Sequence, residues 1–306
     1  MIGYIIKRLL LAIPTILGVI FIVMLTIELV PGDPVELMLG EHATRDAVEN
    51  VRTALGLDKP LLTRYILYLK NLAEGDMGRS IRENRDVSKE ISDVWPATLK
   101  LTIAAMIIAL LIGMALGIIS AVKPNSYFDG LNRIFSLFGL SMPVFWTGLV
   151  MIVIFSFWLR LFPIGGTGSF RHLILPAITL SLPSIAMISR MTRSSLLEVL
   201  REDYVRTARA KGLSEKKVIL KHALKNAFIP IITLSGLQTG QLMGGAILTE
   251  TVFAWPGLGR LMVRAIFARD YILLQGAVLV FALAFVVINL IVDISYSFID
   301  PRVSYK

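Results

Sequence analysis

The chain contains six long segments in which no residue is charged, and these segments limit its fold more than any other feature. Each segment is 17 to 26 residues long. A membrane-spanning helix needs about 20 apolar residues, because each residue rises about 1.5 Å and the hydrocarbon core is ~30 Å thick. We therefore predict an all-α integral membrane protein with six transmembrane helices. The uncharged segments are residues 9–27, 101–122, 134–159, 173–189, 227–249 and 271–292.

The composition argues against a soluble enzyme. Charged residues make up 17% of the chain, against roughly 25% in soluble domains. The absence of cysteine excludes disulfides, thiolate metal sites and cysteine nucleophiles. The chain also lacks the G-x-x-x-x-G-K-[ST] pattern that holds nucleotide phosphates, and its histidines, His42, His172 and His222, have no metal-ligand spacing. We expect no catalytic residue, metal or cofactor in this chain, and an energy source elsewhere.

The basic residues predict the orientation in the membrane. Lys7 and Arg8 precede the first uncharged segment, and cytoplasmic loops of membrane proteins collect Lys and Arg. If the N-terminus is cytoplasmic, the inner side carries 16 basic residues and the two short outer loops carry 5. The net charge of +9 thus fits a membrane protein better than a nucleic-acid-binding protein. We predict a multi-pass protein with both termini in the cytoplasm.

This reading divides the chain into successive parts. A long outer loop separates the first two transmembrane helices, and its residues 58–74 form an apolar helix face that the protein's own helices, the membrane surface or a partner protein must cover. The predicted parts are transmembrane helix 1 (1–30), an extracytoplasmic loop with short helices (31–96), a membrane core with helices 2–6 (97–300) that includes a cytoplasmic loop (192–226), and a cytoplasmic tail (301–306).

Two residue types inside the predicted membrane helices need an explanation. Glycines one helical turn apart let helices approach closely, and we expect such packing at Gly236, Gly240 and Gly244 and at Gly113 and Gly117. An amide in hydrocarbon must find hydrogen-bond partners. Gln238 and Gln241, three residues apart, therefore either bond to neighbouring helices or face a hydrated pathway.

The predicted cytoplasmic loop carries a recognisable motif. Residues 203–213 read DYVRTARAKGL and residues 222–230 read HALKNAFIP. Gly212 followed by Ser214 predicts a helix that ends at a glycine before the next one starts on a serine cap. The segment resembles the EAA loop of binding-protein-dependent ABC importers, in the version of the dipeptide/oligopeptide/nickel permease family. Arg206 departs from the general motif, whereas Gly212 matches it.

Other motifs extend this resemblance over nearly the whole chain, to the first (B-type) permease subunits of dipeptide systems. These are PGDP (31–34), LGLDKP (55–60), GDMG (75–78), WPGLGR (255–260), RDY (269–271) and DPR (300–302). The resemblance implies a type I ABC importer permease in the bacterial plasma (inner) membrane. It also implies a second, C-type permease as heterodimer partner, an extracytoplasmic solute-binding protein, and two ATPase subunits that bind ATP and Mg.

The resemblance further implies that the EAA loop forms a coupling helix seated in a groove of the ATPase. Ala208 and Gly212 are expected to let the loop backbone approach the ATPase, and Arg206, Arg209 and Lys211 to pair with its acidic groups. The expected coupling residues are Arg206, Thr207, Ala208, Arg209, Lys211, Gly212 and Leu213.

The expected function is import of dipeptides or short oligopeptides with ATP hydrolysed by partner subunits. Uncharged amides and hydroxyls suit the pathway, because they hold a zwitterionic solute without trapping it. We expect Gln238, Gln241, Ser141 and Thr147 to line it. Import of glutathione or nickel complexes by the same architecture stays open, and so does a membrane receptor or scaffold without transport.

Overall fold

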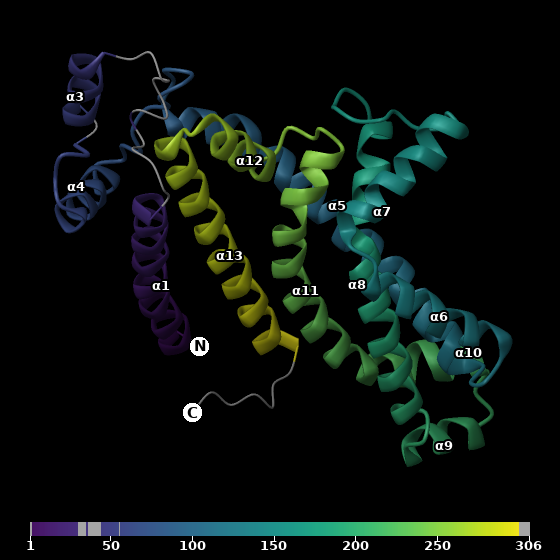
Figure 1. The fold of residues 1–306 in the computed structure, drawn as a ribbon. Helices are drawn as coiled ribbons and strands as arrows, with labels where there is room; N and C mark the ends of the chain where they lie inside the picture. The colour runs from purple at the N-terminus through teal and green to yellow at the C-terminus, as the bar shows by residue number, and fades with distance from the viewer. Residues whose placement is uncertain (1, 30–34, 36–43, 55, 300–306) are drawn as a thin grey trace. The chain divides into compact units, whose positions relative to one another are not determined.

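The computed structural model describes residues 2–29, 35, 44–54 and 56–299, and these residues are almost entirely helical. The only β-type pairing among them is one bridge between Arg79 and Asp86. The all-α prediction is confirmed (Figure 1). The described residues fall into two compact units, of which unit 1 comprises residues 98–255 and 287–299 and unit 2 comprises residues 2–97 and 256–286.

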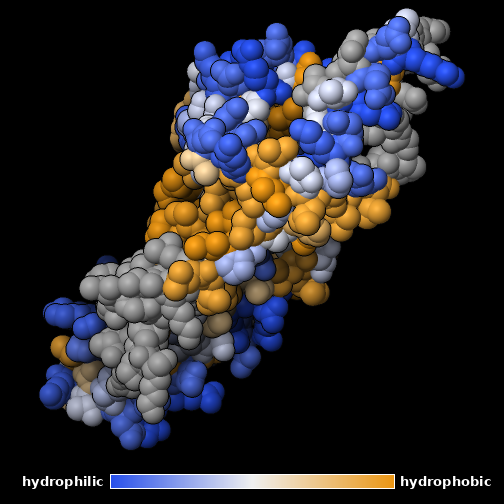
Figure 2. Space-filling model, turned by 90° about the vertical axis from the view of Figure 1, so that its left-hand side faces the viewer, coloured by the Kyte–Doolittle hydropathy of each residue, from blue (hydrophilic) through white to orange (hydrophobic). Residues whose placement is uncertain are grey.

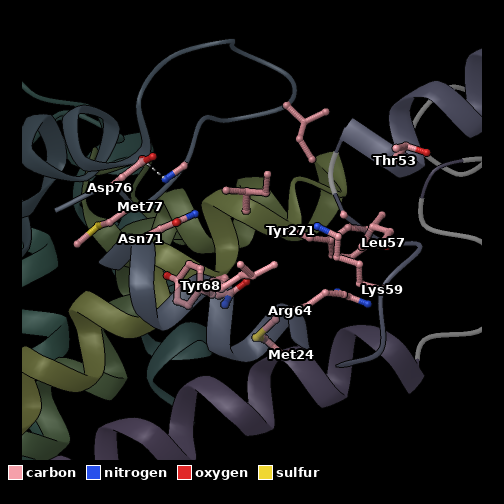
Figure 3. Close-up of a pocket in the computed structure, with 16 residues that line it drawn as sticks. Met24, Thr53, Leu57, Lys59, Arg64, Tyr68, Asn71, Asp76, Met77 and Tyr271 are labelled. Carbon is pink, nitrogen blue, oxygen red and sulfur yellow. Dashed lines mark hydrogen bonds between the residues drawn. The ribbon is translucent and has the colours of Figure 1, made fainter. Parts of the chain in front are cut away.

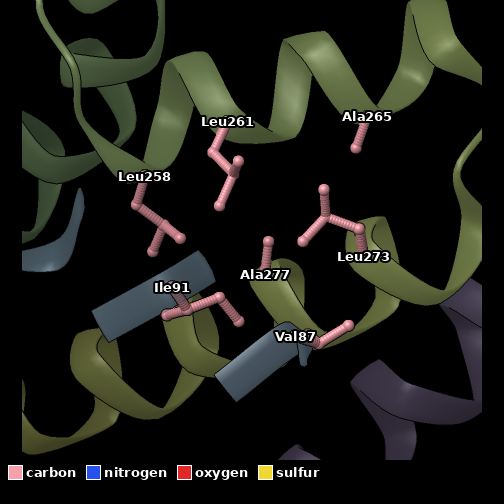
Figure 4. Packing of buried hydrophobic residues seen from close by; sticks show 7 residues of the cluster. All are labelled: Val87, Ile91, Leu258, Leu261, Ala265, Leu273 and Ala277. Atoms are coloured by element: carbon pink, nitrogen blue, oxygen red, sulfur yellow. The ribbon is translucent and has the colours of Figure 1, made fainter. Parts of the chain in front are cut away.

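Unit 2 is built on the first and last helices. Its elements are α1 (Ile2–Leu29), α3 (Arg45–Ala54), α4 (Leu61–Ala73), the start of α5 (Val87–Val122), α12 (Leu258–Ala268) and most of α13 (Tyr271–Ile299). Side chains from α5, α12 and α13 form one buried apolar cluster (Figure 4). Beside this cluster, Gly276 of α13 lies so close to α5 that a Cβ atom there would collide with the Val87 side chain.

The apolar helix face predicted in residues 58–74 belongs to α4, and it packs largely as predicted. Tyr65 and Leu69 lie against the buried residues Ile20 and Met24 of α1, and the Tyr65 hydroxyl donates to the Leu17 carbonyl at 3.0 Å. The protein's own first helix therefore covers this part of the face. Leu62 and Ile66, which the pattern places on the same face, are 63% and 59% exposed.

Unit 1 contains the remaining helices, arranged around α8. They are the rest of α5, α6 (Tyr127–Ser141), α7 (Val144–Met151), the π-helix η1 (Ile152–Trp158), α8 (Phe170–Val199), α9 (Asp203–Ala210), α10 (Glu215–Lys217), the π-helix η2 (Val218–Ala223) and α11 (Leu224–Val252). The apolar window of α8 is 67% buried, against 28–33% for the other long apolar helices. The shortest predicted segment thus forms the most enclosed helix, because its small and polar residues pack against protein.

The third predicted segment is not one straight helix. Residues 134–159 are divided between α6 and α7 with η1, which meet at an angle of 109°. Pro143 lies at the junction, where proline has no N–H to donate and disfavours the helical conformation of the residue before it. The third predicted segment is therefore a bent pair of helices.

The described helices do not confirm the number six. Four are long and apolar enough to cross a membrane, or five if the bent pair is one span, and Leu10–Thr26 is a shorter apolar helix. Their outward residues are large and hydrophobic, as Ile103, Ile107 and Leu111 of α5 show. Figure 2 shows hydrophobic residues gathered on one face of the molecule. This surface suits contact with lipid hydrocarbon.

The predicted glycine packing is present between α5 and α8. A Cβ at Gly113 would stand 3.0 Å from the Ile185 carbonyl oxygen, and one at Gly117 would stand 2.5 Å from the Thr192 Cβ. In α11, Gly236 and Gly240 are buried, whereas Gly244 is exposed with open space around it. The predicted stripe in α11 therefore packs inside the described chain over only part of its length.

Gly117→Val tests the contact between α5 and α8. The added side chain has no room between the two helices, so we expect the free energy of unfolding to fall by about 1–3 kcal/mol. Gly130→Ala in α6 is the control, because nothing lies within 4 Å of a Cβ there. Thermal unfolding of the purified protein in detergent measures both variants. An unchanged melting temperature for Gly117→Val would contradict the packing.

Candidate coupling loop and translocation helices

The connection between α8 and α11 is a folded element. The predicted loop, residues 192–226, is helical at both ends, because α8 continues to Val199 and η2 leads directly into α11. Between them lie α9, a turn at Gly212 and the short α10. The two predicted short helices are therefore present, and each is joined without a long linker to a long apolar helix.

One face of α9 is buried inside the chain. Val205 and Ala208 pack in a cluster that we call the loop core, which also contains Leu196 of α8 and residues of α5, η2 and α11. Ala208 is only 6% exposed. Its small side chain therefore permits close packing within the chain, and the expected approach of the loop backbone to an ATPase at Ala208 stays a prediction. The loop core fixes α9 to the ends of α8 and α11.

Gly212 forms the predicted turn. Its φ is +77°, in the region that residues with a Cβ rarely adopt, and its N–H donates to the Arg209 carbonyl at 2.9 Å. A Cβ at this position would meet no atom within 4 Å. The glycine is thus required here by its backbone conformation. Ser214 precedes α10 as predicted, but its side chain makes no capping hydrogen bond.

The opposite face of α9 is exposed and basic. The Arg206 side chain is 76% exposed and lies 3.6 Å from the Asp203 carboxylate. Arg209 pairs with Glu215 at 2.7 Å across the glycine turn, so its charge is partly engaged within the chain. Lys211 and Thr207 are also exposed, whereas Leu213 is half-buried against the loop core. On this face the Arg206–Asp203 pair is longer, at 3.6 Å, than the Arg209–Glu215 pair, at 2.7 Å.

The predicted pathway residues lie on separate elements. Ser141 ends α6 and is exposed, and Thr147 lies in α7, where its hydroxyl donates to the Pro143 carbonyl at 3.1 Å. Gln238 is 2% exposed, whereas Gln241, on the same helix α11, is exposed. The two amides therefore have different surroundings. Of the two glutamines, Gln241 alone is exposed at the surface of the chain.

The residues beside the bend between α6 and α7 enclose a small apolar cavity of about 170 Å³. Thr147 lines it, together with Thr179 of α8. The Thr179 hydroxyl is buried and has no hydrogen-bond partner among the described residues. The sequence does not predict this cavity, because the cavity depends on the angle between α6 and α7.

Sequence reasoning also missed a buried carboxylate. Glu250 directly follows the fifth uncharged segment, but α11 continues past it to Val252 and Glu250 is fully buried. The Thr98 hydroxyl donates to it at 2.6 Å. An acidic residue at the end of an apolar helix is the signal that could have identified this site.

A larger cavity, of about 330 Å³, lies in unit 2 (Figure 3). Met24 of α1, Tyr68 and Asn71 of α4, and Tyr271 of α13 help to line it. Burial raises the pKa of Tyr68 to about 12, so its hydroxyl stays protonated at neutral pH. The sequence gives no sign of this cavity, because its lining comes from distant segments.

Comparison with known proteins gives full-length matches. The family model for the N-terminal region of binding-protein-dependent transport system membrane components matches residues 1–102, and the model for the inner membrane component matches residues 113–305. The dipeptide transport system permease protein DppB of Alkalihalophilus pseudofirmus is 47% identical, and the glutathione transport system permease protein GsiC of Escherichia coli K12 is 46% identical. Both alignments cover all of each chain.

The fold also matches a solved structure. An inward-facing structure of the MetNI methionine ABC transporter aligns with a TM-score of 0.58 at 18% identity, over 69% of this chain and 96% of the other. At this identity the match supports the fold alone.

Proposed function

Because the chain belongs to the family of binding-protein-dependent transport system inner membrane components, and is thus the permease subunit of an ABC importer and not itself an enzyme, we propose that it translocates short peptides. Full-length similarity to a dipeptide permease carries this proposal. Glutathione is the second candidate substrate, because the glutathione permease is almost equally similar. Both solutes are peptides with free carboxylate and ammonium groups.

The proposed complex contains a second permease of the C-type as heterodimer partner, two ATPase subunits and an extracytoplasmic solute-binding protein, in a bacterial plasma membrane. ATP and Mg are bound by the ATPase subunits, and we propose no cofactor for this chain. The missing nucleotide-phosphate loop supports this division of roles. The multi-pass apolar helices support the membrane location.

The proposed coupling element is α9 with the glycine turn. The loop core joins α9 to α8 and α11. A displacement of α9 therefore moves both long helices as rigid bodies. Its exposed face offers Arg206 and Lys211 to acidic groups of an ATPase. The excess of basic residues on this side of the membrane helices supports a cytoplasmic location and cytoplasmic termini.

The proposed pathway contains Gln241, with Ser141 and Thr147 near the bend. Gln241 is exposed on a helix that leads directly from the coupling element, so a movement of α9 would change its position. Gln238 is buried, and we assign it to packing within the chain. In this arrangement one side of α11 packs within the chain, and Gln241 lies on the other side.

Uptake by the reconstituted complex tests the function and its substrate. We expect liposomes that contain both permeases and the ATPases to accumulate a labelled dipeptide only with ATP and the binding protein. Unlabelled glutathione, longer peptides and a nickel complex serve as competitors that rank the substrates. ATP hydrolysis by a stable complex without accumulation of any of these solutes would favour the receptor or scaffold hypothesis.

Gly212→Val tests the coupling element. A β-branched residue at φ +77° is strained by roughly 1–2 kcal/mol, so the turn should distort and displace α9. We expect weaker ATPase binding and lost uptake, while the two permeases still co-purify. Gly212→Asn is the matched control, because asparagine tolerates this conformation. Normal uptake by Gly212→Val would refute the coupling role.

Gln241→Leu and Gln238→Leu test the pathway as a pair. Leucine removes the polar amide at similar volume. We expect Gln241→Leu to lower the maximal uptake rate while the binding protein keeps its affinity for solute. Gln238→Leu should change thermal stability with little effect on rate. The opposite pattern would show that the pathway lies on the other side of α11.

A further inference from the structure

A fully buried carboxylate joins α6 to α8. Asp129, in the first turn of α6, is 0% exposed. The Arg193 side chain donates to both of its oxygens, from Nε to Oδ1 at 2.6 Å and from Nη2 to Oδ2 at 2.8 Å. The Asn125 backbone N–H donates to Oδ2 at 2.9 Å, and Arg133 lies 3.2 Å away. We call the Asp129–Arg193 pair the clamp.

The clamp lies beside the proposed coupling element. Arg193 is on the last turns of α8, which ends at Val199, and α9 begins at Asp203. Between Arg193 and that end is Leu196, a fully buried residue of the loop core. The same turns of α8 therefore contact both the loop core that holds α9 and the start of α6.

Two further contacts fix α6 along α8. Asn132 and Ser189 exchange hydrogen bonds of 2.9 and 3.0 Å, and Asn132 also donates to Ser120 of α5 at 2.9 Å. Near the end of α6, a Cβ at Gly139 would lie 3.3 Å from both the Leu182 carbonyl oxygen and the Ala186 Cβ. The two helices are thus in contact from the clamp to the bend at Pro143.

Apolar packing alone would hold two helices together, but it would not fix their relative position as tightly. A bidentate arginine–carboxylate pair is directional, and a buried pair is often no more stabilising than apolar residues of similar size. The directional geometry of the clamp therefore fixes where the start of α6 lies along α8.

We propose that the clamp transmits displacement of the coupling element from α8 to α6, and through α6 to the bend with α7. Asp129 and Arg193 are positioning residues in this proposal, because they act through the helices they join. The proposal rests on the proposed function of α9 as the coupling element. It predicts that α6 and α9 move as one body during the transport cycle.

The first test compares hydrolysis with transport in the full reconstituted complex. The double variant Asp129→Leu with Arg193→Met replaces the clamp by apolar residues, and Asp129→Asn is a milder second variant. We expect both to assemble and to hydrolyse ATP in response to the loaded binding protein, while solute moved per ATP falls about ten-fold. Arg133→Gln is the control that leaves the clamp intact. An unchanged ratio in both clamp variants would overturn the proposal.

A second test does not depend on transport and so separates this proposal from the proposed function. The chain has no cysteine, so Tyr127→Cys and Ala210→Cys place spin labels on exposed sites of α6 and α9, outside the clamp and the expected coupling residues. We expect the distance between the labels to stay constant on ATP binding when the clamp is intact, and to change in the clamp variants. A distance that changes equally with and without the clamp would overturn the proposal even if uptake is normal.

Discussion

The close approach of α5 and α8 is the contact on which the rest of unit 1 depends. Gly117 brings the α5 backbone so near α8 that a single methyl group would collide with Thr192. In a membrane there is little hydrophobic gain from burying one apolar helix against another, so such van der Waals contact is a main source of association. Because α8 is enclosed in this way, it can contact α6, α11 and the loop core at once.

Polar groups in the enclosed region are placed where they join helices. Asn132 and Ser189 link α6 to α8, and Thr98 donates to Glu250 across α5 and α11. Away from water each such group must have a partner, so each bond restricts how two helices can lie. Hydrocarbon-facing residues such as Leu111 carry no such restriction. The position of α8 is therefore defined by directional contacts as well as by packing.

This arrangement gives a physical account of coupling. The loop core is small and apolar, and it holds α9 against the ends of long helices without flexible linkers. A displacement of α9 cannot be absorbed within such a loop, because close-packed side chains resist compression. The bend at Pro143 lies at the far end of the helix that the clamp holds to α8. In the proposed coupling, a displacement of α9 thus reaches α8, α11 and α6 through close-packed and hydrogen-bonded contacts.

The sequence by itself determined the helical membrane class, the family and the glycine turn of the coupling element, because each depends on local pattern: uncharged length, motif spacing and the conformational freedom of Gly212. It did not determine the break at Pro143, the different exposure of Gln238 and Gln241, or the burial of Ala208 and Glu250. Those features depend on which helices become neighbours. The helix face on which a residue lies follows from helical periodicity and can be predicted from the sequence. Its burial depends on side chains that are distant in the sequence, and only the packed structure brings them together.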